Sequence, residues 1–220
     1  MPVRAFVFDA YGTLFDVHAA IAQHREAGAD TDRFSEIWRA KQLEYGWMLS
    51  AAGHYVDFWT LTERALDYAF LRVPSVDKTL RATLLDAYFK LEAFPDARAA
   101  LSGLKAKGLK TAILSNGNPR MLDGAVTAAG IGSDLYAVLS VDAIRIYKPR
   151  PEVYALVTQA FAIAPSDVAF VSSNRWDVMG ATAFGFHCVW VNRANLPDEY
   201  PEFAGVKIVR DLSALATLTL

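Results

Sequence analysis

The sequence predicts an α/β fold, namely a Rossmann-like, doubly wound parallel sheet core with an inserted all-helical cap subdomain. Short β-branched and aromatic runs alternate with helical patterns from about residue 110 onwards, as in sheets with helices on both faces. Residues 17–94 instead show successive amphipathic helical patterns without a strand pattern. A length of 220 residues suits one core with one insertion. We therefore expect a core domain over residues 1–16 and 95–220 and a cap subdomain over 17–94.

Each predicted strand is a short, nearly continuous apolar run, which is typical of a strand buried on both faces of a sheet. Five such runs are evident, and a shorter one near the C-terminus predicts a sixth strand. In chain order the runs are Val3 to Asp9, Lys110 to Asn116, Ala137 to Val141, Asp167 to Ser173, His187 to Asn192 and Val206 to Val209.

Helical patterns separate the later strands. The patterns over Pro119 to Ala129 and Pro151 to Ala162 both begin with proline, a residue suited to the first helical turn. A third pattern covers Trp176 to Phe184, and Leu212 to Leu218 predicts a closing helix. Because strands and helices alternate, neighbouring strands are expected to run parallel with helices on both faces of the sheet.

The insertion contains two apolar stripes at helical spacing, each predicting an amphipathic helix. The first stripe comprises Phe34, Trp38, Tyr45, Met48, Leu49 and Ala52, and the second comprises Phe58, Leu61, Ala65, Leu66 and Ala69. Breaks between helices are expected at Gly53, Pro74 and Pro95.

Charge and hydropathy exclude several classes of partner. The chain has 22 basic and 24 acidic residues and no basic run, so neither nucleic acid nor an anionic membrane is an expected partner. No apolar run exceeds five residues, as in Ala160 to Ala164, which is far shorter than the roughly 18 to 20 residues that cross a bilayer. One cysteine, Cys188, lies in an apolar run and predicts a buried thiol. With no export signal pattern at the N-terminus, we expect a cytoplasmic protein.

Polar residues cluster where the predicted strands end. Asp9 ends the first strand, Ser115 and Asn116 end the second, Lys148 follows the third, and Asp177 lies beyond the fourth. In a parallel sheet these positions meet at one edge, where ligands bind. A single strand-end aspartate is usually a turn or cap residue. The ordered series of carboxylate, hydroxyl, lysine and second carboxylate instead indicates an active site with a nucleophilic aspartate.

This series resembles the haloacid dehalogenase superfamily, and the resemblance covers the whole chain, including the helical insertion. Two departures from the superfamily's phosphatases are informative. Those enzymes carry a second aspartate two residues after the nucleophile as a general acid, whereas Tyr11 stands here and does not serve near neutral pH. They also hold Mg²⁺ with acidic residues after strand four, whereas this loop offers a Ser-Ser-Asn run before the single carboxylate of Asp177. No metal and no other cofactor is therefore expected.

Three motifs narrow the resemblance to the L-2-haloacid dehalogenases. They are Phe-Asp-Ala-Tyr-Gly-Thr-Leu at 8–14, Tyr-Lys-Pro at 147–149 and Ser-Ser-Asn-x-Trp-Asp at 172–177. The resemblance implies that Asp9 attacks the carbon bearing the halogen and forms an enzyme ester, which water then opens. The implied activity is metal-independent hydrolysis of (S)-2-haloalkanoic acids, and of haloacetates, to 2-hydroxy acids, with the (R) configuration where C2 is chiral. Halide leaves without a proton, which fits the missing general acid.

The segment Trp38-Arg39-x-Lys41-Gln42-Leu43-Glu44-Tyr45 matches the family's cap helix. Through this match, the resemblance implies that Arg39 stabilises the departing halide, with Leu43 four residues on along the same helix face. Catalytic roles are implied for Asp9, Thr13, Arg39, Ser115, Lys148, Tyr154, Ser172, Asn174 and Asp177. Substrate or halide binding is implied for Ala10, Tyr11, Arg39, Leu43, Phe58, Ser115, Asn116 and Trp176.

Other interpretations stay open at this stage. By residue type alone, Arg39 fits a solvated surface charge, and Phe58, Tyr154 and Trp176 fit core packing. Two alternative functions use the same pocket: an Mg²⁺-dependent phosphatase or phosphonatase-like hydrolase, and a catalytically silent binder of small carboxylates. None of the four histidines has a partner at metal-ligand spacing. The resemblance implies a homodimer whose substrate is a small halogenated carboxylic acid.

Overall fold

The structure, a computed structural model, describes residues 3–22 and 30–218. Its core is a six-stranded sheet with the order β3-β2-β1-β4-β5-β6, in which all neighbouring strands are parallel. The strands are β1 (Ala5–Phe8), β2 (Lys110–Ser115), β3 (Ala137–Ser140), β4 (Val168–Ser172), β5 (His187–Val191) and β6 (Lys207–Val209). Each strand lies within a predicted run, which confirms the doubly wound α/β fold.

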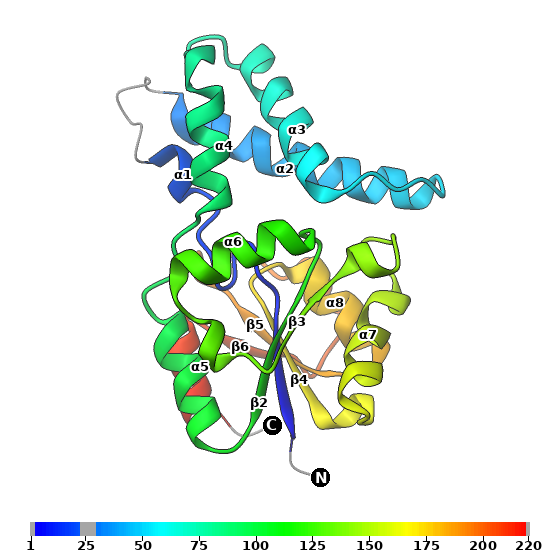
Figure 1. Cartoon of the computed structure of the whole chain (residues 1–220). Coiled ribbons are helices and arrows are strands. Elements are labelled where there is room, and N and C mark those ends of the chain that lie inside the picture. The colour runs from blue at the N-terminus through cyan, green and yellow to red at the C-terminus, as the bar shows by residue number, and fades with distance from the viewer. Residues whose placement is uncertain (1–2, 23–29, 219–220) are drawn as a thin grey trace.

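Helices cover both faces of this sheet. Figure 1 shows α5 and the C-terminal turn η6 on one side, with α7 and α8 on the other. The α-helices are α1 (Ala19–Ala22), α2 (Thr31–Ala51), α3 (Phe58–Arg72), α4 (Arg81–Phe89), α5 (Ala97–Ala106), α6 (Pro119–Ala129), α7 (Pro151–Phe161) and α8 (Arg175–Phe184). The bounds of α6, α7 and α8 agree with the predicted ranges to within one residue. No helix among the described residues has the length and apolarity that a membrane span requires.

Two elements of the core differ from the sequence prediction. Helix α5 was not predicted, because two of its four buried positions are alanines, which give a weak apolar signal. The predicted closing helix is a 3-10 helix, η6 (Leu212–Ala216). Its buried residues, Leu212 and Leu215, are three apart, the repeat of a 3-10 turn.

Strand β3 also departs from the prediction, because it is not buried on both faces. It lies at the edge of the sheet, and within residues 3–22 and 30–218 its one partner strand is β2. Val138 in the middle of β3 is 43% exposed. An edge strand has a neighbour on one side only, so its apolar run does not imply full burial. Cys188 in β5 is buried and unpaired, as predicted.

Helices α1 to α4 form a separate layer beyond the carboxyl ends of the strands (Figure 1). The predicted stripe of α3 is fully buried. In α2, Phe34 and Trp38 are buried, and Tyr45 and Leu49 are partly buried against the core. Met48 is 58% exposed and Ala52 is also exposed, so the predicted stripe is wrong at these two positions. The C-terminal end of α2 extends past α1 and α4 (Figure 1), and there Ser50 Oγ accepts a hydrogen bond from Tyr147 N at 3.0 Å. Residues 23–29 of the predicted insertion, including His24, lie outside the described residues.

Polar contacts tie this helical layer to the core at positions far apart in the sequence. Asp57 caps the N-terminus of α3 and also accepts a hydrogen bond from Asn118 Nδ2 at 3.0 Å. Asn118 in turn caps α6, where its Oδ1 accepts from Met121 N at 2.9 Å. Nearby, Tyr55 Oη donates to Asp142 Oδ1 at 2.7 Å. Two helix caps therefore hold each other, and they fix α3 against the sheet side of the molecule.

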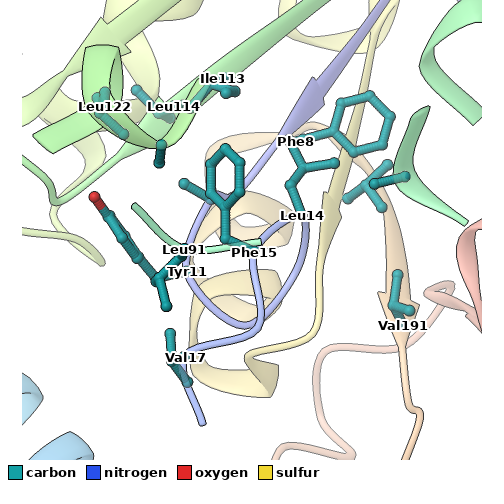
Figure 2. Close-up of a cluster of buried hydrophobic side chains, with 14 of the residues drawn as sticks. Phe8, Tyr11, Leu14, Phe15, Val17, Leu91, Ile113, Leu114, Leu122 and Val191 are labelled. Atoms are coloured by element: carbon teal, nitrogen blue, oxygen red, sulfur yellow. The ribbon is translucent and has the colours of Figure 1, made fainter. Parts of the chain in front are cut away.

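The chain that leaves β1 is itself part of the core. Figure 2 shows Leu14 and Phe15 within a cluster of apolar side chains that includes Leu122 of α6. Leu14 and Phe15 are fully buried, and Phe15 forms an isolated antiparallel bridge with Ala93, where the chain returns from the helical layer. The segment that follows Asp9 is therefore held by close packing on all sides.

Two glycines provide a test of how tightly the helical layer packs on the core. A Cβ atom at Gly124 in α6 would lie 2.5 Å from Phe89 Cε1 and 2.9 Å from the Phe89 carbonyl oxygen in α4. A Cβ at Gly103 in α5 would meet no atom of the described residues within 4 Å. Gly124→Ala is expected to lower the free energy of unfolding by about 1–3 kcal/mol through overpacking. Gly103→Ala is expected to raise it by roughly 0.5–1 kcal/mol through helix propensity. Urea unfolding measures both, and equal effects of the two substitutions would show that α4 does not press on α6.

Candidate active site

Asp9 directly follows β1, and its carboxylate accepts hydrogen bonds from groups on two other segments. Oδ1 accepts from Lys148 Nζ at 3.0 Å. Oδ2 accepts from Asn174 Nδ2 at 2.8 Å and from Thr13 Oγ1 at 3.2 Å, with Ser172 Oγ at 3.5 Å. The Asp9 residue is only 6% exposed. The sheet order explains the convergence, because β4 lies directly beside β1 and carries Ser172 and Asn174 to the same edge.

A second carboxylate lies behind the lysine. Lys148 Nζ donates to Asp177 Oδ2 at 2.7 Å, and both side chains are fully buried. Tyr154 Oη donates to Asp177 Oδ1 at 2.8 Å. Burial raises the pKa of Asp177 to about 6, although the Lys148 ammonium opposes the rise. Burial alone lowers the pKa of Lys148, but the carboxylates of Asp177 and Asp9 outweigh it and hold that pKa above its usual value.

The end of β2 and the turn after β1 present donors to the same edge. Asn116 Oδ1 accepts from Lys148 N at 3.1 Å, so the amide nitrogen of Asn116 is the end that remains available to a ligand. Ser115 is fully buried at the end of β2. Within the described part of the chain, the N–H groups of Ala10 and Tyr11 donate to no protein acceptor. Hydroxyl and backbone N–H donors in this arrangement suit a small carboxylate.

Arg39 reaches this edge from α2 in the helical layer. Its Nη2 donates to the Tyr11 carbonyl oxygen at 3.1 Å. Arg39 and Leu43 line a cavity of about 290 Å³ together with Gly12 and Asn174. Asn174, which donates to Asp9, therefore lines the same cavity as Arg39.

The two predicted aromatic binding residues occupy different places. Trp176 and Lys148 line a second cavity, of about 420 Å³, where the Trp176 ring meets Trp47 edge-on at 5.2 Å between centroids. Phe58 is 1% exposed, and its ring packs 6.2 Å from that of Tyr11. Phe58 is not among the residues that line either cavity. The structure therefore brings Trp176 to the edge of the site and places Phe58 in the aromatic layer beneath it.

Sequence reasoning missed two residues that hold the site in place. Ser173 Oγ donates to the Gly12 carbonyl oxygen at 2.6 Å, and Ser173 N donates to Thr13 Oγ1 at 2.8 Å, so Ser173 joins the loops after β1 and β4. Gln42 accepts from Arg39 Nη1 at 2.7 Å. The signals for both were local: Ser173 lies within a polar run at a strand end, and Gln42 lies three residues after Arg39 on one helix.

Comparison with known proteins agrees with this geometry. A family model for haloacid dehalogenase-like hydrolases matches residues 3–185. Over 201 residues the chain is 50% identical to (S)-2-haloacid dehalogenase 1 of Pseudomonas sp. (strain CBS-3), which covers 90% of this chain and 88% of the relative. The chain belongs to the haloacid dehalogenase family. This result confirms the resemblance drawn from the strand-end residues.

Two further members of the haloacid dehalogenase family that resemble this chain have names that state their substrate or activity. Haloacetate dehalogenase H-2 of Moraxella sp. (strain B) is 39% identical over 194 residues, covering 87% of this chain and 86% of the relative. The solved structure of L-2-haloacid dehalogenase from Xanthobacter autotrophicus with chloropropionic acid covalently bound superposes with a TM-score of 0.85 at 37% identity, covering 97% of each chain. The similarity therefore extends over the sheet and the helical layer together.

Replacing the shared lysine tests the electrostatics of the site. Lys148→Met leaves two buried carboxylates without a cation, so the free energy of unfolding is expected to fall by about 3–5 kcal/mol at pH 8. Asp177 already has a pKa of about 6 beside the lysine, and without it that pKa rises further. In the variant Asp177 therefore binds a proton at pH 5, and the loss of stability is smaller at pH 5 than at pH 8.

Urea unfolding at the two pH values measures this difference. The double variant Lys148→Met with Asp177→Asn serves as the control, because removing the second charge is expected to restore part of the stability at pH 8. A loss of equal size at both pH values would contradict the charge-based explanation and indicate lost packing instead.

Proposed function

We propose that this chain hydrolyses (S)-2-haloalkanoic acids, and haloacetates, to the corresponding 2-hydroxy acids, with the (R) configuration where C2 is chiral. The observation that carries the proposal is the buried Asp9 carboxylate, held by Lys148, Thr13 and Asn174 at the edge of the sheet. Relatives that are 50% and 45% identical over most of the chain bear the name (S)-2-haloacid dehalogenase. A covalently bound chloropropionic acid in the X. autotrophicus structure supports a covalent route.

In the first step a carboxylate oxygen of Asp9 attacks C2 of the substrate. The C–O bond forms as the carbon–halogen bond breaks, and the halide leaves with the bonding electron pair. Attack from the side opposite the halogen inverts C2 once. The N–H groups of Ala10 and Tyr11, with the Ser115 hydroxyl, bind the substrate carboxylate and hold C2 in line with Asp9.

The departing halide takes its negative charge toward Arg39. The guanidinium and the amide nitrogen of Asn116 donate to it, while Leu43, Trp176 and the aromatic layer that includes Phe58 keep the site apolar. In water-poor surroundings such donors stabilise developing charge more strongly than in bulk water. Halide needs no proton to leave, which is consistent with Tyr11 two residues after the nucleophile.

In the second step water attacks Cγ of the Asp9 ester. The bond between Cγ and the ester oxygen breaks, so the former Asp9 oxygen becomes the hydroxyl oxygen of the product. The regenerated carboxylate carries the oxygen of water, and the overall reaction releases one proton and one halide. Thr13, Ser172 and Asn174 surround the reacting carboxyl group. Lys148, Asp177 and Tyr154 form a hydrogen-bonded network beside it and help to position the water.

The proposed reaction proceeds without a metal ion. Supporting this, Lys148 Nζ already provides a positive charge between Asp9 and Asp177, at 3.0 and 2.7 Å. Among the described residues, no three His, Cys, Asp or Glu side chains are grouped to hold a cation. A hard cation prefers several carboxylate oxygens, and the segment from the end of β4 through the first turn of α8 offers one carboxylate, that of Asp177.

The proposal includes the organisation of the chain and its setting. Residues 17–94 act as a cap over a core formed by 1–16 and 95–220, with Arg39 as the cap's contribution to the site. We further propose a cytoplasmic homodimer. The buried, unpaired Cys188 supports a reducing compartment. The 58% exposed Met48 near the C-terminal end of α2 supports a contact between copies.

Stereospecific halide release is the first test. With excess EDTA, the protein is expected to release chloride from (S)-2-chloropropionate and not from the (R) form. Asp9 attacks C2 from the side opposite the halogen, and only one enantiomer presents that side to Asp9 while its carboxylate is bound. Asp9→Asn is the matched control and should release none while remaining folded by circular dichroism. Phosphate release from a generic ester only when Mg²⁺ is added would favour the phosphatase alternative. Protection from heat by chloropropionate without chloride release would favour a silent binder.

Isotope labelling tests the ester intermediate. In a single turnover in ¹⁸O-water, the label is expected in Asp9 and not in the first product molecule, since water attacks the Asp9 carbonyl carbon. Mass spectrometry of the peptide that contains Asp9, and of the 2-hydroxy acid, measures both. Label found directly in the product would exclude the ester and indicate attack of water on C2.

A further inference from the structure

Arg39 is a long and only half-buried side chain, so its direction must be set by hydrogen bonds. Two are present, on different nitrogens. Nη2 donates to the Tyr11 carbonyl oxygen at 3.1 Å, and Nη1 donates to Gln42 Oε1 at 2.7 Å. Because a guanidinium is planar, two bonds to separate nitrogens fix both its position and the plane of its remaining N–H groups.

Gln42 is an unusual residue for its location. It is 0% exposed, in a part of α2 where Phe34 and Trp38 are also buried. Both ends of its amide are bonded: Nε2 donates to Thr62 Oγ1 at 2.6 Å, and Oε1 also accepts from Tyr88 Oη at 3.0 Å. A buried amide costs free energy unless it is fully hydrogen-bonded, and an apolar residue of similar size fills such a position more cheaply.

The hydrogen-bond donors fix which way this amide points. Thr62 Oγ1 gives its only hydrogen to the Phe58 carbonyl oxygen at 2.7 Å, so toward Gln42 it can only accept. The amide nitrogen of Gln42 must therefore face Thr62, and Oε1 must face Arg39. Arg39 has donors only, which is consistent with this assignment.

The donor on the other side of Oε1 is equally constrained. Tyr88 is 3% exposed, and its ring stacks on that of Tyr11 at 5.7 Å with an angle of 15° between planes. Burial raises the pKa of Tyr88, so its hydroxyl stays protonated and continues to donate to Gln42. Tyr11 thus contacts both partners in the network: its ring supports Tyr88, and its carbonyl oxygen accepts from Arg39.

We propose that Gln42 is a positioning residue for dehalogenation, which acts through Arg39 by holding the guanidinium toward the point where the halide leaves. The inference rests on the proposed function. Thr62 and Tyr88 form the supporting layer that keeps Gln42 Oε1 turned toward Arg39. Gln42 itself touches neither substrate nor halide.

Three variants test this role while preserving shape. Gln42→Leu removes both ends of the amide, Gln42→Glu keeps an acceptor for Arg39, and Tyr88→Phe removes one donor but keeps the stacked ring. Thr111→Val is the control: Thr111 is also buried and donates to a backbone carbonyl oxygen, that of Asp134, but it lies at the start of β2, away from the site. Halide release from (S)-2-chloropropionate and (S)-2-bromopropionate gives kcat and KM for each.

The leaving group provides the decisive readout. Chloride leaves less readily than bromide and depends more on a well-placed donor, so Gln42→Leu is expected to lower kcat for the chloro acid about tenfold and less for the bromo acid. The bromide-to-chloride ratio of kcat is expected to rise about threefold or more, with KM within about twofold. Gln42→Glu should recover most of the wild-type ratio, Tyr88→Phe should shift it in the same direction as Gln42→Leu, and Thr111→Val should leave it unchanged.

A double-mutant cycle separates positioning from a general structural effect. If Gln42 acts through Arg39, Gln42→Leu causes little further loss in an Arg39→Ala background. Suppose the wild type releases halide. An unchanged bromide-to-chloride ratio of kcat in Gln42→Leu, or a full further loss of kcat in the double variant, then overturns the positioning role alone. A wild type that releases no halide overturns the proposed function and this role with it.

Discussion

One buried ammonium group is shared by two carboxylates, and the geometry of the site depends on this sharing. Lys148 Nζ lies 3.0 Å from Asp9 and 2.7 Å from Asp177, with the lysine and Asp177 side chains fully buried. Two carboxylates this close, removed from water, repel each other unless a cation lies between them. The three groups come from the end of β1, the loop after β3 and the first turn of α8, so only the folded sheet assembles them.

The helical layer supplies a second positively charged side chain near the carboxylate pair. Arg39 enters from α2 and donates to the Tyr11 carbonyl oxygen, two residues after Asp9. The layer is tied to the core through paired helix caps at Asp57 and Asn118, and through the stacked rings of Tyr88 and Tyr11. Movement of α2 relative to the sheet would therefore carry the guanidinium away from the carboxylate, and the same contacts that stabilise the fold also set the distance between the two charges.

Structural features that depend on one short segment of the chain, such as the end of a strand, were predictable from the sequence. Strand-end positions placed Asp9, Lys148 and Asp177 at one edge, because a parallel sheet has only one carboxyl edge. Features that depend on distant partners were not predictable. The partial exposure of β3 follows from its edge position, and the buried amide of Gln42 is satisfied by Thr62 and Tyr88, which lie 20 and 46 residues away in the sequence. No periodicity in α2 reveals such partners, because a polar residue on a helix is normally solvated.

Lys148 and Arg39, the two positively charged side chains of the site, are placed for opposite stages of the proposed displacement: Lys148 for the starting carboxylate and Arg39 for the departing halide. Before it, negative charge lies on Asp9 beside Lys148; after it, Asp9 is a neutral ester and the charge has moved to the halide beside Arg39. A lysine devoted to Asp9 alone would stabilise the starting carboxylate and raise the barrier, since only stabilisation that grows toward the transition state speeds a reaction. Lys148 Nζ lies 2.7 Å from Asp177 and 3.0 Å from Asp9, so its charge is shared between two carboxylates. Shared with Asp177 in this way, Lys148 holds Asp9 in place but stabilises its carboxylate less strongly than a lysine paired with Asp9 alone would.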